Sequence, residues 1–211
     1  MKTALLAFCL LLTRPAFTQD AAIDKVSGRV SLRPEGEERW LRAKAGDTLI
    51  FGDSVKTSAH GAAQVVIGKG KAAVLLAENT QFTLRGEPEN EVIDFTIGEF
   101  LIGLFKKLQK NQSLRASTPA AVASVRGTLF WGKTDESDNA TFAGFGHIVE
   151  VSAHGSTVTL KAGELTTVAK GRAPTDAAPH HVPLDYLKNF AIEGGLQGVD
   201  GLIDPALKPR P

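Results

Sequence analysis

Cysteine is almost absent from this sequence, and its single copy stands near the start of the chain. Cys9 lies inside a short apolar run, Ala4–Leu12, of the kind found in export leaders. Removal of such a leader leaves no thiol, which excludes a disulfide framework, a thiolate metal site and a cysteine nucleophile. A lipid-modified cysteine is disfavoured because the apolar run continues past Cys9 to Leu12.

Long apolar segments are missing as well. A helix needs about 20 apolar residues to cross a bilayer, and no run in this sequence reaches that length. Lys2, the apolar run and the small residues around Ala16-Phe17-Thr18 together predict a secretory signal peptide over residues 1–18. An uncleaved anchor is the alternative. We expect the mature chain to be periplasmic or secreted, without a transmembrane span.

The sequence also lacks a surplus of either charge. It has 24 Lys and Arg against 23 Asp and Glu, a net charge of +1, and loss of Lys2 and Arg14 with the leader would bring the mature form to −1. Nucleic-acid-binding proteins need a strongly basic footprint. This balance therefore argues against a nucleic-acid partner.

No catalytic constellation or cofactor motif is recognisable. The sequence has no Gly-x-Ser-x-Gly elbow, and Gly68–Lys71 has the wrong spacing for a phosphate loop. His147 and His154 are expected to face solvent from strands, and the adjacent His180 and His181 point in opposite directions if the chain there is extended. We therefore expect a protein that is not an enzyme, with no catalytic residue, cofactor or metal site.

Glycine and short alternating apolar runs are abundant. The 21 glycines include the turn pairs Gly46-Asp47 and Gly52-Asp53. Strands are expected about every ten residues, at residues 22–32, 40–41, 49–57, 61–68, 71–77, 80–84, 91–105, 141–151, 157–160 and 165–168. This spacing predicts a single all-β domain over residues 22–170, built as an elongated β-roll, a solenoid-like stack or a distorted sandwich.

The composition changes after Lys170. Residues 171–181 contain prolines and the two adjacent histidines, which is typical of a linker. Leu184, Leu187 and Phe190 then recur at helical spacing. Residues 171–211 are thus expected to form a linker and a tail with a short helix, which docks on the β domain or on a partner, and a frayed end.

The most distinctive segment is residues 116–131, Ala-Ser-Thr-Pro-Ala-Ala-Val-Ala-Ser-Val-Arg-Gly-Thr-Leu-Phe-Trp. Thr118-Pro119 favours an extended or turn conformation. Gly127 allows a backbone conformation that other residues avoid. Arg126 beside it is a fixed charge with five donors, able to bind several carbonyls or a carboxylate.

This segment resembles the signature of the FecR domain family. The matching residues are Thr118, Pro119, Val122, Ala123, Val125, Arg126, Gly127, Thr128 and Phe130. Ser124 departs from the pattern, since the family usually has glycine there. Further positions match between Gly46-Asp47 and Gly163-Glu164, so the resemblance covers about residues 46–170.

The resemblance implies an exported sensing or interaction domain. In the regulators that give the family its name, the domain receives a signal from an outer-membrane TonB-dependent transporter and passes it across the inner membrane to a sigma factor. This sequence shows neither a cytoplasmic segment before the domain nor a spanning helix, so transmembrane signalling is not carried over. We expect a non-catalytic protein-interaction or sensing module of the bacterial cell envelope, with another envelope or secreted protein as partner. The alternative is a carbohydrate- or peptidoglycan-binding module.

Arg126 is the signature residue with two competing interpretations. A buried carbonyl left unpaired costs about 1–3 kcal/mol, so Arg126 is expected to hold backbone carbonyls or an acidic side chain such as Glu99 or Glu164. The alternative is an anchor for a partner. The other signature residues are expected to be structural.

Two further groups are candidates for partner binding. Trp40 is expected either in the core or as an exposed platform, whereas Trp131 is expected in the core. Lys106, Lys107 and Lys110 lie close together and would contact an acidic partner or a membrane surface, or form a solvated loop.

Overall fold

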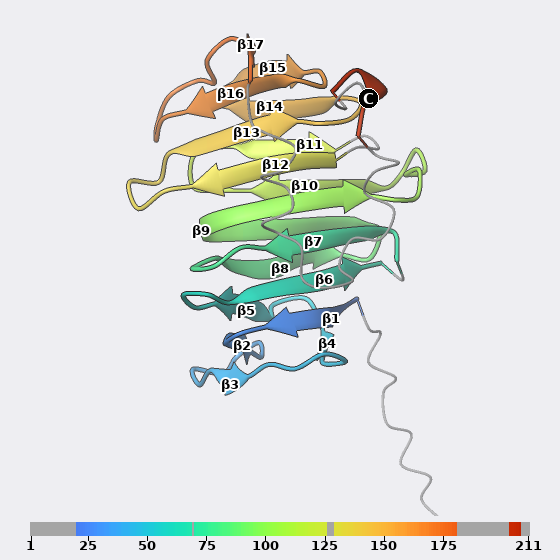
Figure 1. Cartoon of the computed structure of the whole chain (residues 1–211), viewed down its shortest axis with the longest axis vertical. Helices are drawn as coiled ribbons and strands as arrows, with labels where there is room; N and C mark the ends of the chain where they lie inside the picture. The colour runs from blue at the N-terminus through green and yellow to red at the C-terminus, as the bar shows by residue number, and fades with distance from the viewer. Residues whose placement is uncertain (1–19, 69, 126–128, 181–202, 208–211) are drawn as a thin grey trace, which may run out of the picture.

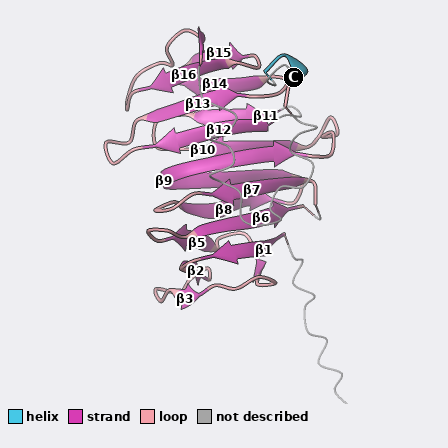
Figure 2. Ribbon diagram, in the orientation of Figure 1, coloured by secondary structure: helices cyan, strands magenta, loops and turns pink. Residues whose placement is uncertain are grey.

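The computed structural model describes residues 20–68, 70–125, 129–180 and 203–207. Strands dominate these ranges, and the described helical element is one short 3-10 turn, η3 (Pro205–Leu207) (Figure 2). Seventeen strands in these described ranges are hydrogen-bonded into one mixed sheet that folds over into two layers. Within each layer, the strands follow one another along the long axis of the molecule (Figure 1). The predicted all-β fold is confirmed. The predicted signal peptide, the helix expected around residues 183–192 and Arg126-Gly127-Thr128 lie outside the described residues.

The first layer, sheet A, has nine strands in an order that largely follows the chain. They are β4 (Thr48–Leu49), β1 (Ala21–Ser27), β6 (Ala62–Ile67), β7 (Ala72–Leu76), the second half of β9 (Asn90–Leu104), β12 (Leu129–Thr134), β13 (Ala140–Gly144), β16 (Glu164–Val168) and β17 (Ala178–Pro179).

The second layer, sheet B, is ordered in the same way. Its strands are β3 (Leu41–Arg42), β2 (Val30–Arg33), β5 (Ser54–Thr57), β8 (Gln81–Glu87), the first half of β9, β10 (Ser113–Ser117), β11 (Val122–Val125), β14 (Val149–Ala153) and β15 (Ser156–Leu160). Among the described pairs, β9 and β10 are parallel and the others antiparallel.

Strand β9 belongs to both layers, and Gly98 marks the point where it passes from one to the other. Gly98 has a φ of +106°, and a Cβ on it would overlap the backbone of Thr80. Thr80 is fully buried, and its hydroxyl accepts a hydrogen bond from the backbone N–H of Glu99 (2.9 Å) and donates to the carbonyl of Glu99 (3.0 Å). The bend that joins the sheets therefore requires glycine at this position.

We expect Gly98→Ala to lower the free energy of unfolding by at least about 2 kcal/mol, because it combines a disfavoured backbone conformation with a steric overlap. Urea unfolding followed by circular dichroism measures this. Gly36→Ala is the matched control, since Gly36 also has a positive φ, +76°, but faces open space. Equal losses in the two variants would show that the close approach of Thr80 is unimportant.

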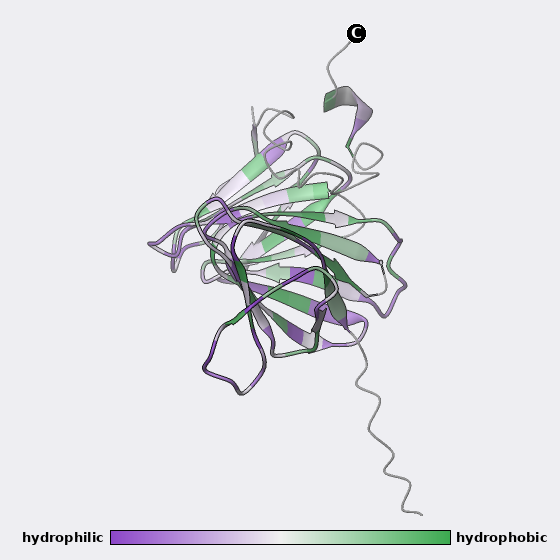
Figure 3. Ribbon diagram, turned by 60° about the horizontal axis from the view of Figure 1, so that its bottom comes forward, coloured by the Kyte–Doolittle hydropathy of each residue, from purple (hydrophilic) through white to green (hydrophobic). Residues whose placement is uncertain are grey.

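The main core lies between the two sheets. Phenylalanines form a chain of ring contacts across it. Phe95 stacks on Phe100 with ring centroids 3.6 Å apart, Phe82 contacts Phe95 at 5.8 Å and Phe130 meets Phe100 edge-on at 6.2 Å. Apolar residues follow the strands, and hydrophilic ones gather in the connecting loops (Figure 3).

A second apolar cluster lies on the outer face of sheet A. It contains Leu75, Leu101, Leu129, Trp131 and Phe145, each at most 8% exposed. Ile203, from the end of the chain, is buried against it, and the backbone N–H of Asp204 donates to the carbonyl of Phe145 (2.8 Å). Residues 203–207 were expected to fray but instead dock on the β domain, because this sheet face is apolar and needs a cover.

Candidate partner-binding surfaces

The described residues of the signature segment form a turn and pack in the β domain. The Thr118 hydroxyl donates to the carbonyl of Ala121 (3.0 Å) and accepts from its N–H (3.1 Å), which closes the turn between β10 and β11. Pro119 is exposed in this turn, and Val122 is half-buried on the outer side of β11. Val125 and Phe130 face the main core. These residues shape the fold, and Val125 also lines a hollow beside the loop between β9 and β10.

The outer face of sheet B is a long polar surface. Cross-strand neighbours place Arg33, Ser54, Thr83, Asp94 and Ser117 in one row across five strands. The Ser54 and Thr83 hydroxyls are 2.9 Å apart, and Arg85 Nε donates to Asp94 Oδ2 at 2.7 Å. The two sheets thus have unlike outer faces: that of sheet A carries an apolar cluster that Ile203 covers in part, while that of sheet B presents polar side chains.

Trp40 lies at one end of this polar surface, next to β3. It is half-buried, and the Arg33 guanidinium and the Lys56 ammonium lie 4.9 and 4.1 Å from its ring centroid. Cations at this distance are attracted to the electron-rich ring face. Arg42 lies opposite Ser31 on the neighbouring strand, and Ser31 lies opposite Lys56, so Arg42 and Lys56 are on the same side of sheet B. Trp40 is therefore a surface residue surrounded by positive charges.

The three candidate lysines lie in the loop between β9 and β10, and all are exposed. Lys107 and Lys110 line a hollow of about 580 Å³ together with Ser124 and Glu150. Strands β2, β5, β8 and β9 separate this part of sheet B from β3, so the structure does not bring the lysines next to Trp40.

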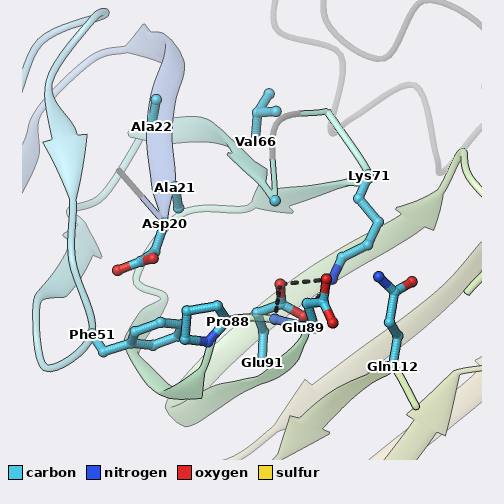
Figure 4. Close-up of a pocket in the computed structure, with 11 residues that line it drawn as sticks. Asp20, Ala21, Ala22, Phe51, Val66, Lys71, Pro88, Glu89, Glu91 and Gln112 are labelled. Carbon is cyan, nitrogen blue, oxygen red and sulfur yellow. Dashed lines mark hydrogen bonds and ion pairs between the residues drawn. The ribbon is translucent and has the colours of Figure 1, made fainter. Parts of the chain in front are cut away.

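The residue pattern did not reveal a second cavity of about 510 Å³, at the strand ends near β6 and β9 (Figure 4). Lys71 and Glu91 meet in it, with Nζ 2.6 Å from both carboxylate oxygens, and both side chains are less than 10% exposed. Asp20 and Glu89 also line the cavity. The lysine and glutamate neutralise each other, so this group forms an ion pair rather than a nucleophile with a general base.

Asp20, which lines this cavity, has a shifted proton affinity. Burial raises the pKa of its carboxyl group above the usual value, and the nearby negative charge of Glu91 adds to the rise, while a hydrogen bond from the backbone of Phe51 opposes it. Loss of solvation and like charge both disfavour the ionised form.

Three of the histidines singled out in the sequence, His147, His154 and His180, are among the described residues. His154 forms a turn between β14 and β15, and His147 is exposed. His180 has Nε2 3.1 Å from the carbonyl of Gly144, and its ring contacts that of Phe145. Within the four described ranges, no three His, Cys, Asp or Glu side chains are placed to share a metal ion. In the same ranges, no helix has the length and apolar character that a bilayer crossing requires.

The fold is similar to that of two crystal structures of a "putative anti-sigma factor" from Parabacteroides distasonis. Both have a TM-score of 0.55 and cover 64% of this chain, with 16% and 17% sequence identity. The similarity spans 63% and 64% of those two chains. At this identity the likeness establishes a shared all-β architecture. No family model matches the sequence, and no curated protein does so at a significant level.

Proposed function

We propose that this chain is an exported FecR-domain protein that acts as a non-catalytic protein-interaction or sensing module of a bacterial cell envelope. The ordered match at residues 118–130 supports the family, and the leader-like residues 1–18 support export. The structural likeness to a candidate anti-sigma factor supports a regulatory or sensing role, because the two share their β architecture. The expected partner is another envelope or secreted protein.

The observation that carries the proposal is the cationic setting of Trp40 on the outer face of sheet B. Tryptophan and arginine are enriched among residues that dominate protein–protein binding energies. Arg33, Arg42 and Lys56 give this site positive charge, which complements acidic side chains on a partner.

A carbohydrate- or peptidoglycan-binding module is the second candidate, favoured by the polar surface beside Trp40. A sugar needs a free ring face for stacking. Arg33 and Lys56 both lie within 5 Å of the ring centroid, and they compete for that position. The geometry therefore supports a protein partner more than a sugar.

The test is a crosslinking pull-down from an envelope fraction with the wild-type chain, Trp40→Ala and Lys56→Glu as baits. We expect one protein to be captured by the wild type and to be reduced at least about tenfold with either variant, since loss of a dominant interface residue costs about 2 kcal/mol or more. Arg115→Ala is the matched control, because Arg115 is exposed on the same face but lies on β10, five strands away from β3.

Melting temperatures of all variants, measured by circular dichroism, separate a binding defect from unfolding. Capture that is unchanged in both variants would exclude the Trp40 site. Loss of bound glycan fragments instead of a protein would favour the carbohydrate-binding module.

A further inference from the structure

The edge strands of the two sheets differ in how well they are protected from pairing with another chain. β3, β4 and β17 are each two residues long, and β17 includes Pro179, which has no N–H. β1 carries an irregularity between Ile23 and Lys25. Short strands, proline and bulges all hinder pairing with another chain.

β15 is the exception. Ser156–Leu160 reads Ser-Thr-Val-Thr-Leu, a five-residue strand without charge, proline or glycine, at the end of the stack opposite β3 (Figure 1). In the described ranges, β14 is the strand that pairs with it, and no backbone hydrogen bond is made along its other edge. Ser156, Thr157 and Thr159 are exposed.

The hairpin between β14 and β15 determines which backbone groups this edge presents. Its turn residues His154 and Gly155 have φ values of +48° and +76°, which is typical of a two-residue type I′ turn. Ala153 and Ser156 flank this turn as the first hydrogen-bonded pair. Because such pairs alternate along an antiparallel ladder, the N–H and C=O groups of Thr157 and Thr159 point away from β14.

These groups are arranged for pairing with an identical strand. In an antiparallel arrangement with a two-fold axis at Val158, Thr157 lies opposite Thr159 of the second copy, and Thr159 opposite Thr157. Both are then hydrogen-bonded pairs, with four backbone hydrogen bonds in total, and Val158 meets its own copy. Val158 packs partly against the main core, so this arrangement would also continue the core from one molecule to the next.

We propose that β15 is a dimerisation edge, which pairs antiparallel with β15 of a second copy of this chain and joins the two B sheets into one. The proposal does not depend on the envelope function. Among the described strands, the other edges are the two-residue β3, β4 and β17, which are too short for a second pairing site, so we expect the assembly to close as a dimer. One strand pair buries less area than a standard interface, so the dissociation constant is expected on the order of 10 µM.

The test compares two double variants by sedimentation velocity over a concentration series, with the wild type. In Thr157→Lys/Thr159→Lys, each lysine at 157 faces the lysine at 159 of the other copy, and we expect at least a tenfold weaker dimer. In Thr157→Glu/Thr159→Lys, each glutamate faces a lysine, and we expect dimerisation to return to the wild-type level or above. The variants differ only at position 157, and in both the lysine at 159 lies beside Glu150 of β14.

Each of these expected results can overturn the proposed β15 dimer. A wild-type chain that stays monomeric above about 100 µM overturns the proposal, because the expected dissociation constant lies well below that value. A dimer that is equally strong in both double variants would also overturn the proposal, because the interface would then lie elsewhere. Failure of the Thr157→Glu/Thr159→Lys variant to regain dimerisation would overturn it as well. Far-UV circular dichroism and melting confirm that the variants fold, as expected for exposed positions.

Discussion

Replacing Lys71 by methionine is expected to lower the free energy of unfolding by about 3–5 kcal/mol. Lys71 is 7% and Glu91 3% exposed, and the ammonium lies 2.6 Å from both carboxylate oxygens. Methionine fills a similar volume but leaves the Glu91 carboxylate buried without its counter-charge. The large effect therefore comes from a buried carboxylate without a counter-charge. It does not measure how much the intact ion pair stabilises the fold.

The same reasoning predicts that the double variant Lys71→Met/Glu91→Met recovers most of the loss, because replacing both charges of a buried pair by apolar groups is often neutral or stabilising. Urea unfolding of the wild type, both single variants and the double variant gives the coupling energy. Lys170→Met is the control, since Lys170 is also 2.6 Å from its partner Asp138 but 65% exposed. It should cost less than about 1 kcal/mol. A similar cost at Lys71 would show that the Glu91 site is open to water.

The fold was predictable from sequence where turn residues bound a short segment rich in apolar or β-branched residues. The segment around Val65, which lies between two glycines, and the segment around Phe82, which follows a turn, correctly indicated β6 and β8. β10 was missed, because Ser113–Ser117 directly follows the lysine-rich loop and gains its place from parallel pairing with β9, a distant partner that no local pattern reveals. Likewise, the expected strand at 141–151 is two strands, β13 and β14, in different sheets.

The candidate sites were predictable only where one residue type is noticeable in the sequence by itself. Trp40 attracts notice as one of two tryptophans, but its neighbours Arg33 and Lys56 are brought to it by strand pairing. The Lys71–Glu91 pair joins residues 20 positions apart, one in the turn before β7 and the other on β9, and neither position looks buried in the sequence. The open edge of β15 depends on which strands lie beside it, which is a property of the completed sheet.

Phe100→Ala is expected to cost about 3–5 kcal/mol, the range for removing a large buried aromatic side chain. Phe100 is fully buried, stacks on Phe95 with the rings 7° from parallel and meets Phe130 edge-on. Its ring connects the halves of β9 on either side of the Gly98 bend. Phe105→Ala, at a 39% exposed site, is the control and should change stability by no more than about 0.5 kcal/mol.

Gly132 provides a sharper test of the same packing. It lies opposite Phe100 in the β9–β12 ladder, and a Cβ on it would overlap the Phe100 ring. Gly132→Ala should therefore destabilise the wild type, by about 1–3 kcal/mol for overpacking. In the Phe100→Ala background, the added methyl group enters the vacated space, so the same change should be neutral or stabilising. The four unfolding free energies form a double-mutant cycle. Additive losses would mean that the ring of Phe100 is not what requires glycine at position 132.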